Sequence, residues 1–491
     1  MSANTSSTRW QGSPEPDQRF VGRRVVVMGL GGFGGGAGAA RWLTQQGAKV
    51  LVTDLADAGT LDDAVGSLSD CDIEYRLGGH DEADLDRADL LVVNPAVPKK
   101  RSEFFQAAVR RGIRWTTEIN LFLERCRATV IGVTGTAGKS TAAAMIHAVL
   151  SRQSRGGPHG GPYVTADPRS ATRGLGTCYL GGNFGGSLLG DLDRMTANDT
   201  VVLELSSFQL ADLPLIERRP DVAVYVEIWP NHLDRHGTYE TYLACKLNMI
   251  RGANTGTPVV LGLEDPATSR RITELCEPTG CNPWALRAVA VDKPVPALAL
   301  KVRGAHNLRH ANCAATVGTL LGVHRDAIRA SLEAFSGLGH RLQFVGCFGG
   351  VDYYNDSKST NTRSTAAALG SFDQPVIALV GGALKPTDSN PWAWGERDVL
   401  ASALRDGARA TICFGPAGKM VRRALMKIGG SGMDADVHWV ATLEEAVASA
   451  KKIGRRGDVV VLSPGFQSYD AFANYERRGE AFMSVVRSGG R

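Results

Sequence analysis

Short apolar runs alternate with helix-forming stretches along most of the chain, and glycine, proline or acidic residues separate them. The runs RRVVVMGL, KVLVTDL and ADLLVVNPAVP near the N-terminus predict strands, as do TVVLELSSFQL and DVAVYVEI further on. In the last third, PVIALVGG, ATICFG and DVVVLSPG predict strands, with helices from about Glu396, Pro416 and Thr442 and a last helix over about 470–486. This alternation predicts mostly parallel sheets with right-handed crossovers.

The pattern divides the 491 residues into three consecutive α/β domains behind a polar tail. We expect a disordered tail over 1–20, a Rossmann-like domain over 21–117, a P-loop ATPase-like central domain over 118–336 and a second Rossmann-like domain over 337–491. The stretch 151–176 is rich in Gly, Pro, Arg and Ser and has no periodicity, which predicts a flexible surface insertion in the central domain.

Composition narrows the class of protein. Hydrophobic residues make up 43% of the chain and charged residues 21%, as in ordinary soluble proteins, and the net charge of +5 is too small to call for nucleic acid or an anionic membrane as partner. No apolar run is long enough to span a bilayer, and the polar start is unlike a signal peptide. The nine scattered cysteines indicate reduced thiols. We therefore expect a cytoplasmic enzyme, and nothing requires more than a monomer.

The segment IGVTGTAGKST predicts a nucleotide site. An apolar strand over 128–133 runs into a glycine turn and a helix from Lys139, so backbone N–H groups and the helix N-terminus form a cradle for phosphate. Lys139 can reach the outer phosphates, and Ser140 or Thr141 can ligate Mg²⁺. Val133 stands where the strict P-loop pattern has its first glycine. We expect this loop to bind ATP through Thr134, Gly135, Thr136, Ala137, Gly138, Lys139, Ser140 and Thr141.

A second glycine pattern opens the N-terminal domain. Gly29, Gly31 and Gly34 fit G-x-G-x-x-G, and the next strand ends on Asp54. Asp54 could hold a ribose hydroxyl or a base edge. This fingerprint alone is weak support for NAD, because any nucleotide diphosphate can use the same cradle.

Three further features suggest chemistry in the central domain. Glu204 ends an apolar strand and is placed to ligate Mg²⁺ directly or through water. The cluster NHLDRH, with His232, follows another strand, which is typical of a site. Taken alone, Lys246 would be interpreted as a solvated lysine. A polar cluster that a structural strand end would not need adjoins Glu204, namely Ser206, Ser207 and Gln209.

Polar residues also follow strands around the third domain. Asn307 could read an adenine edge or simply cap a helix, and Arg341 could clamp the γ-phosphate. The loop YNDSKSTN carries Asp356 and Lys358, and other strand ends carry hydroxyls and a cation. Such strand ends suggest a pocket for a small anionic substrate, lined by residues that include Lys385, Ser468 and Tyr469.

Taken together, these motifs identify a resemblance. The chain resembles the Mur ligases of peptidoglycan synthesis, and most closely their D-glutamate-adding branch. The matching motifs run nearly end to end: TGTAGKST, GGNFGG, ELSSFQL, NHLDRH with Lys246, GAHN, GHR, NDSKSTN, GGALK and LSP…SYD…NYERRG. ELSSFQL and NDSKSTN separate this branch from its sister ligases. Residues 465–467 (GFQ) depart from the small residues usual before Ser468, and Ala137 stands where Asn is usual.

The resemblance implies an ATP-dependent amide ligase that joins D-glutamate to UDP-N-acetylmuramoyl-L-alanine through an acyl phosphate, in peptidoglycan precursor synthesis and hence in cell-wall biogenesis, cell shape and division. By the resemblance, two Mg²⁺ ions would be held by Ser140, Glu204, His232 and a Lys246 carbamylated by CO₂. Catalysis would depend on Lys139, His232, Lys246 and Arg341, and adenosine would contact Asn307 and Asp356. The UDP-substrate would contact Gly31, Gly32, Phe33, Asp54, Leu55, Asn183, Ser207 and Gln209. D-Glutamate would contact Lys358, Thr360, Lys385, Ser468, Tyr469 and Tyr475.

Two alternatives stay open at this point. One is another ATP-dependent amide ligase, either a sister Mur ligase or a folylpolyglutamate synthase. The other is an NAD-dependent oxidoreductase built on the glycine pattern at Gly29. The second nucleotide loop, with Lys139 and Ser140, argues against the oxidoreductase.

Overall fold

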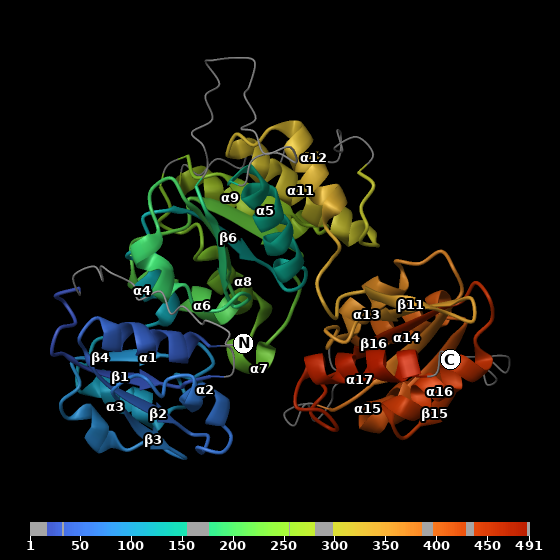
Figure 1. Ribbon diagram of the computed structural model, residues 1–491, viewed down its shortest axis with the longest axis horizontal. Coiled ribbons are helices and arrows are strands. Elements are labelled where there is room, and N and C mark those ends of the chain that lie inside the picture. Colours follow the sequence, from blue (N-terminus) through green and yellow to red (C-terminus); the bar gives the residue numbers. More distant parts are fainter. Residues whose placement is uncertain are drawn as a thin grey trace, which may run out of the picture. The chain divides into compact units, whose positions relative to one another are not determined.

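The computed structural model describes residues 17–31, 34–154, 176–254, 256–279, 298–384, 396–428 and 437–488. The chain divides into two compact units, one made of Met1–Lys293 with Cys313–Ala327 and the other of Pro294–Asn312 with Ile328–Arg491. Within the described residues the first unit holds two five-stranded sheets and the second a six-stranded sheet (Figure 1). The expected α/β class, with three sheets in succession, is confirmed.

The first sheet has the order β3-β2-β1-β4-β5 and all its strands are parallel. Its strands are β1 (Arg24–Met28), β2 (Lys49–Asp54), β3 (Ile73–Leu77), β4 (Leu90–Val93) and β5 (Trp115–Thr116). The helices of this part are α1 (Gly35–Gln45), α2 (Asp62–Gly66), α3 (Glu103–Arg110) and α4 (Glu118–Leu123), with a 3₁₀ turn η1 (Glu82–Leu85). The strand order reverses between β1 and β4, and ligands bind outside the carboxyl ends of strands at such a switch point.

The central sheet has the order β10-β9-β6-β8-β7, again all parallel. Its strands are β6 (Thr129–Thr134), β7 (Cys178–Gly182), β8 (Thr200–Glu204), β9 (Val222–Val226) and β10 (Val259–Gly262). Both β8 and β9 are buried along their whole length, which explains their unbroken apolar sequences. The other elements are α5 (Lys139–Ser154), η2 (Leu189–Arg194), α6 (Ser207–Ala211), η3 (Leu213–Leu215), α7 (Leu233–His236), α8 (Tyr239–Leu247) and α9 (Pro266–Thr279).

The third sheet has the order β11-β12-β16-β13-β14-β15, and its edge strand β11 runs antiparallel to β12. The strands are β11 (Gln343–Phe348), β12 (Val351–Asn355), β13 (Val376–Gly381), β14 (Ala410–Phe414), β15 (Val437–Val440) and β16 (Val459–Gly465). The helices of this part of the sequence are α13 (Thr362–Leu369), α14 (Glu396–Gly407), α15 (Gly415–Ile428), α16 (Leu443–Ile453) and α17 (Tyr475–Ser488), preceded by α11 (Ala305–Leu320) and α12 (Arg325–Ala334). Apolar clusters cover both faces of the sheet.

Three boundaries differ from the sequence prediction. Phe20, which we assigned to the tail, is buried and its ring lies 5.3 Å from that of Trp42. The helix after the ATP loop continues to Ser154, and the last helix begins at Tyr475, because the residues before it form turns. The predicted site residues Gly32, Phe33 and Lys385, and residues 155–175 of the insertion, lie outside the described residues.

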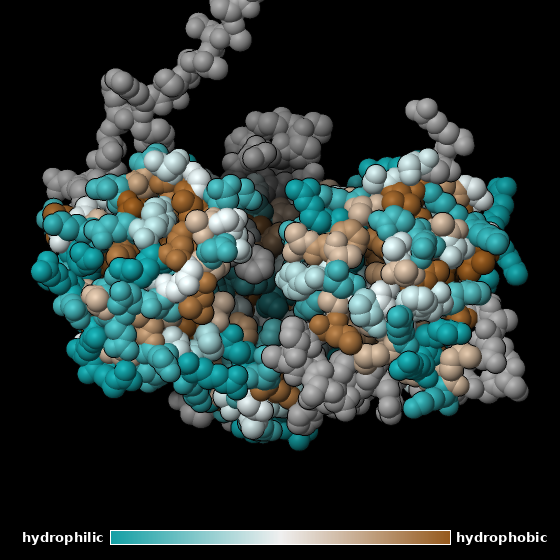
Figure 2. Space-filling model, turned by 90° about the horizontal axis from the view of Figure 1, so that it is seen from below, coloured by the Kyte–Doolittle hydropathy of each residue, from teal (hydrophilic) through white to brown (hydrophobic). Residues whose placement is uncertain are grey.

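The face drawn in Figure 2 mixes polar residues with scattered apolar ones. Such scatter is normal for a folded protein. In the part of the chain that the structure describes, we find no helix with the length and apolarity that a membrane span requires.

Candidate active site

The loop after β6 has the geometry of a phosphate cradle. Gly138 has a φ of 77°, a left-handed conformation that glycine adopts without strain. Gly135 packs so closely that a Cβ there would lie 2.7 Å from the carbonyl oxygen of Val226. The first turn of α5 follows at once, and its N–H groups have no acceptor within the helix. The loop therefore suits an anion, as predicted.

Lys139, Ser140 and Glu204 are brought together at this cradle. The Ser140 hydroxyl donates to Oε2 of Glu204 at 2.5 Å, and the amide of Asn183 donates to the other carboxylate oxygen, Oε1, at 3.1 Å. Glu204 is 2% exposed at the end of β8, which pairs with β6. Adjacent hydroxyl and carboxylate oxygens are hard donors of the kind that Mg²⁺ prefers. The residues present therefore fit the predicted ion.

Lys246 is buried rather than solvated, so its interpretation as a surface lysine is wrong. It is 1% exposed, and Nζ donates to the carbonyl oxygen of Gly135 at 2.7 Å and to Oγ1 of Thr134 at 3.3 Å. Burial holds the pKa of this amine well below its usual value, and the nearby charge of Lys139 lowers it further. The amine therefore lies directly behind the ATP loop in a state that favours loss of its proton.

The NHLDRH cluster places two histidines beside ELSSFQL. His232 has a φ of 53°, in the left-handed region where a non-glycine residue is uncommon, and such strain concentrates at functional sites. His236 stacks on Phe208 with ring centroids 5.1 Å apart, and its Nε2 shares a hydrogen bond of 3.0 Å with the hydroxyl of Ser207. Burial lowers the pKa of His236, and Lys246 adds to this. The two motifs form one polar cluster.

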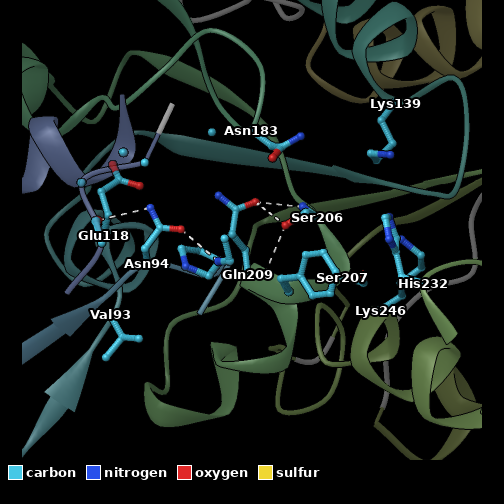
Figure 3. A pocket seen from close by; sticks show the side chains of 18 of the residues that line it. Val93, Asn94, Glu118, Lys139, Asn183, Ser206, Ser207, Gln209, His232 and Lys246 are labelled. Atoms are coloured by element: carbon cyan, nitrogen blue, oxygen red, sulfur yellow. Dashed lines mark hydrogen bonds between the residues drawn. The ribbon is translucent and has the colours of Figure 1, made fainter. Parts of the chain in front are cut away.

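One cavity of about 410 Å³ joins these groups to the glycine loop of the first sheet. Figure 3 shows Asn94 and Glu118 at one end of it and Lys139, His232 and Lys246 at the other. The predicted site residues that line it are Gly31, Gly135, Thr136, Lys139, Asn183, Ser207, Gln209, His232 and Lys246. Residues assigned from the sequence to two separate ligands thus face one space.

Asp54, for which we predicted a ligand contact, also has a structural role at the glycine loop. Its Oδ2 accepts the backbone N–H of Leu30 at 2.8 Å and its Oδ1 accepts that of Ala56 at 2.9 Å. Both oxygens thus fix the glycine loop to the end of β2. The neighbouring Leu55 is 71% exposed, which makes it available to a ligand.

In the second unit, the loop between β12 and α13 is built around a buried acid. Asp356 accepts the hydroxyl of Ser463 at 2.8 Å and the N–H of Leu342 at 3.1 Å, and burial raises its pKa to about 6. His340 and Leu342 have φ values of 61° and 44°. Arg341 lies between these two strained residues, and its positive charge acts to lower the pKa of Asp356. The GHR and NDSKSTN motifs therefore form one cluster.

Asn307 lies near the start of α11 and does not act as its N-cap. Its Nδ2 donates to the carbonyl oxygen of Arg303 at 2.6 Å, and its Oδ1 lies 3.3 Å from Nδ1 of His310. Burial lowers the pKa of His310 to about 3, so this imidazole stays neutral. The amide of Asn307 is thereby held in one orientation.

The residues predicted for D-glutamate that the structure describes lie at one end of the third sheet. Nζ of Lys358 lies 3.6 Å from the centre of the Tyr475 ring, a cation–π contact. Ser468 is buried, whereas Tyr469 is 70% exposed. Thr360 donates its N–H to the carbonyl oxygen of Lys358 at 2.9 Å. With Tyr469 exposed and Ser468 buried, the end of this sheet offers both an open ring and a sheltered hydroxyl.

Three residues of these sites were missed by the sequence reasoning. Tyr242 forms a 2.8 Å hydrogen bond with Thr136 of the ATP loop, and Glu118 lines the cavity. Arg478 is fully buried and donates to the backbone carbonyls of Ser357, Phe466 and Gln467. Arg478 lies in the NYERRG motif, which could have singled it out. A buried arginine needs many acceptors, and these carbonyl groups supply them. Glu118 and Tyr242 carried no signal beyond their residue type.

The described residues contain no group of three or more His, Cys, Asp and Glu side chains that could hold a metal by themselves. The predicted metal ligands include just two such residues, Glu204 and His232.

A P-loop-type cradle beside a carboxylate, a buried lysine and a second glycine loop define a nucleotide-dependent group-transfer enzyme of the α/β class. Three family models match the chain: Mur ligase MurD-like, N-terminal domain, over residues 23–116; Mur ligase middle domain over 133–284; and Mur ligase, glutamate ligase domain, over 340–466. The chain belongs to the Mur ligase family, and it is a ligase.

Relatives match it nearly end to end. The UDP-N-acetylmuramoylalanine–D-glutamate ligase of Geotalea uraniireducens (strain Rf4) is 33% identical over 485 residues, which covers 96% of this chain and 98% of that protein. The enzyme of the same name from Roseiflexus sp. (strain RS-1) is 33% identical over 502 residues, covering 96% and 99%.

Solved structures agree on the fold. UDP-N-acetylmuramate-alanine ligase MurC from Thermotoga maritima superposes with a TM-score of 0.56 at 17% identity, covering 95% of this chain and 99% of its own. MurF from Acinetobacter baumannii gives 0.54 at 14% identity, covering 96% and 92%. At these identities the likeness shows the fold alone.

Proposed function

We propose that this chain is an ATP-dependent ligase that attaches D-glutamate to UDP-N-acetylmuramoyl-L-alanine in the cytoplasm. The observation that carries the proposal is the shared cavity, in which the ATP loop and the glycine loop of the first sheet face the same space. A nucleotide-sugar held by the glycine loop would extend towards the phosphates of ATP. The names of the relatives supply the amino acid, D-glutamate.

The proposed reaction has two steps. The terminal carboxylate of the nucleotide-sugar substrate attacks the γ-phosphate of ATP, so that a carboxyl oxygen bonds to phosphorus and ADP leaves. The amine of D-glutamate then attacks the carbonyl carbon of the acyl phosphate, loses a proton, and expels phosphate to leave an amide. The first step brings two anions together, so cations must neutralise the phosphoryl group. Lys139 at the cradle supplies one such charge, and we assign a second to Arg341.

Mg²⁺ would be held by Ser140 and Glu204, whose oxygens are 2.5 Å apart, with His232 and a carbamylated Lys246 as ligands of a second ion. When bound, the ions would stabilise negative charge on the phosphoryl oxygens. Two features support the carbamate. The lowered pKa of Lys246 favours the neutral amine, which is the form that can attack CO₂, and the adjacent Lys139 would attract the new negative charge.

The remaining contacts follow from the placement of side chains within each unit. We assign the cavity residues Asn183, Ser207 and Gln209 to the nucleotide-sugar, with exposed Leu55 against its uridine. We assign Asn307 and Asp356 to adenosine, and to D-glutamate the group Lys358, Thr360, Lys385, Ser468, Tyr469 and Tyr475. One copy of the chain supplies all these groups, so we expect a monomer to be active.

Phosphate release from ATP and Mg²⁺ with UDP-N-acetylmuramoyl-L-alanine tests the proposal. We expect release with D-glutamate and none with L-glutamate, glycine, L-alanine, L-lysine or diaminopimelate. Release with another amino acid would assign a sister activity, and no release with any of them would overturn the proposal. Glu204→Gln should abolish release, whereas Glu264→Gln, a matched change outside the cavity, should leave it intact.

A further inference from the structure

Glu118 is a buried acid, and one of its two carboxyl oxygens has a hydrogen-bond partner. It is the first residue of α4, capped by the side chain of Thr117, and it is 8% exposed. One oxygen, Oε1, accepts the hydroxyl of Ser187 at 2.5 Å. Among the described residues no partner is found for Oε2, and Glu118 lines the cavity (Figure 3). Oε2 is not one of the fully buried side-chain atoms that lack a partner, so it stays open to the cavity, where a ligand can contact it.

The surrounding backbone is shaped to hold this carboxyl in place. Ser187, which orients Glu118, packs against Gly38 of α1, where a Cβ would lie 2.6 Å from its Oγ. A Cβ on Gly36 would meet the carbonyl oxygens of Gly29 and Leu30. The helices α1 and α4 and the turn η2 contact one another here. Glycines on α1 thus bring its N-terminus and the Glu118 carboxyl to the same end of the cavity.

The elements packed against Glu118 place no charged group beside its carboxyl that would compensate a negative charge there. Burial is the main influence on Glu118 and raises its pKa to about 7, against the lowering effect of the Ser187 hydrogen bond. The glycine loop, residues 94–98 and residues 183–188 carry no ionisable side chain, and α4 has none besides Glu118. The one ionisable group of α1 is Arg41, which pairs with Asp70 at 2.7 Å. The ionisable groups of η2 are Asp191, Asp193 and Arg194, and Arg194 pairs with Asp191 at 2.8 Å. The basic side chains across the cavity are Lys139 and Lys246, with His232 beside them.

We propose that Glu118 binds the diphosphate of the nucleotide-sugar, as a carboxylic acid that donates a hydrogen bond from Oε2 to a phosphate oxygen. The inference rests on the proposed function, because that function supplies the nucleotide-sugar. The glycine loop and the N-terminus of α1 are where a diphosphate is expected to bind. An ionised carboxylate at that place would repel it. The protonated acid, by contrast, offers the donor that a phosphate oxygen accepts, and an anion close by favours the protonated form further.

The test compares three variants of the full-length enzyme. Glu118→Gln keeps a donor in place of the protonated oxygen, Glu118→Ala removes it, and Glu124→Gln makes the same chemical change at the C-cap of α4, outside the cavity. The KM for UDP-N-acetylmuramoyl-L-alanine, ATP and D-glutamate is measured between pH 6 and 9. Calorimetric titration with the nucleotide-sugar, UDP and uridine is carried out in the absence of ATP.

We expect Glu118→Ala to raise the KM for the nucleotide-sugar about tenfold or more at pH 6, with the other two KM values unchanged. In the wild type this KM should rise as the pH passes about 7, because the acid ionises and the donor is lost. Glu118→Gln should abolish that rise, since its amide does not titrate, and Glu124→Gln should keep it. A purely structural role would not produce a pH dependence that the amide abolishes.

Two results would overturn the inference. One is an unchanged KM in Glu118→Ala, or the same pH profile in wild type and Glu118→Gln. The other is weaker binding of the nucleotide-sugar with unchanged binding of UDP, which would place the contact on the sugar. Uridine should bind all variants equally. An inactive wild type would refute the proposed function instead, and the calorimetry would still report on Glu118.

Discussion

Replacing Arg478 by methionine should destabilise the second unit strongly. Its guanidinium is fully buried and donates four hydrogen bonds: to Oγ and O of Ser357 at 3.0 and 2.9 Å, and to the carbonyl oxygens of Phe466 and Gln467 at 3.1 and 2.8 Å. These partners lie just after β12 and at the end of β16. Burial lowers the pKa of Arg478 to about 10, so the side chain stays charged at neutral pH. The arginine thus joins two predicted D-glutamate loops.

The magnitude follows from what the change leaves behind. Methionine fills similar volume, but the buried carbonyl oxygens of Ser357 and Phe466 lose their donor, at about 1–3 kcal/mol each, whereas that of Gln467 keeps the N–H of Ala383. Part of this is recovered because a charge no longer has to be buried. We expect a net loss of about 3–5 kcal/mol. Because Arg478 contacts main-chain oxygens of Phe466 and Gln467, the unusual side chains of residues 465–467 do not disturb this support.

Hydrogen exchange read by mass spectrometry measures the effect locally, which suits a chain of two units that need not unfold together. Amides of β12 and β16 should exchange faster in Arg478→Met, and those of β6 and β8 should not change. Arg477→Met is the matched control, because Arg477 is largely exposed and pairs with Glu480. A loss below about 1 kcal/mol in β12 and β16, or an equal loss in the control, would refute the reasoning.

Three further changes test other parts of the structure. Lys246→Met keeps an apolar stem in a buried place, so we expect a thermal unfolding midpoint close to that of the wild type. The variant should release no phosphate. With ¹³C-bicarbonate, the wild type should give a carbamate NMR signal that this variant lacks. Gly135→Ala puts a Cβ 2.6 Å from Cγ2 of Val226 and should raise the KM for ATP about tenfold by shifting the cradle, whereas an unchanged KM would contradict the cradle. Asp356 has a folded pKa of about 6, above its ordinary 3.8, so the folded state binds the proton more tightly and stability falls as pH rises between these values. Denaturation at pH 4 and 7 should show a fall of at most about 3 kcal/mol in the wild type that Asp356→Asn lacks, and a parallel pH response in both proteins would refute the assignment.

Much of the fold could be predicted because the chain signals it locally. Unbroken apolar runs such as that of β8 are typical of parallel strands buried on both faces, and Gly138 before Lys139 marks the turn into α5. The elements β3, β5 and α2 were missed. β5 and α2 are too short to show a period, and pairing with a neighbour holds β5 in place. β3 is as long as β8, but its middle residues are exposed and it carries no apolar run.

The site could be predicted only in part, because the burial of some of its residues depends on tertiary packing. Glu204 follows an apolar strand, so its place at a strand end could be inferred from the sequence. Lys246 and Glu118 could not be recognised from their own neighbours, because their burial depends on what packs over them: the ATP loop for Lys246, and Ser187 with α1 for Glu118. The two backbone N–H groups that Asp54 accepts could not be predicted either, because they depend on how the glycine loop packs against the end of β2.

The central claim is that one chain activates a carboxylate with ATP and transfers it to D-glutamate. The most direct measurement uses UDP-N-acetylmuramoyl-L-alanine labelled with ¹⁸O in both oxygens of its terminal carboxylate, with ATP, Mg²⁺ and D-glutamate. We predict an amide product formed from the substrate and D-glutamate with loss of one water, and this product should retain one ¹⁸O. The released phosphate should contain the other ¹⁸O. Unlabelled phosphate, or ATP hydrolysis with no new amide, would contradict the account.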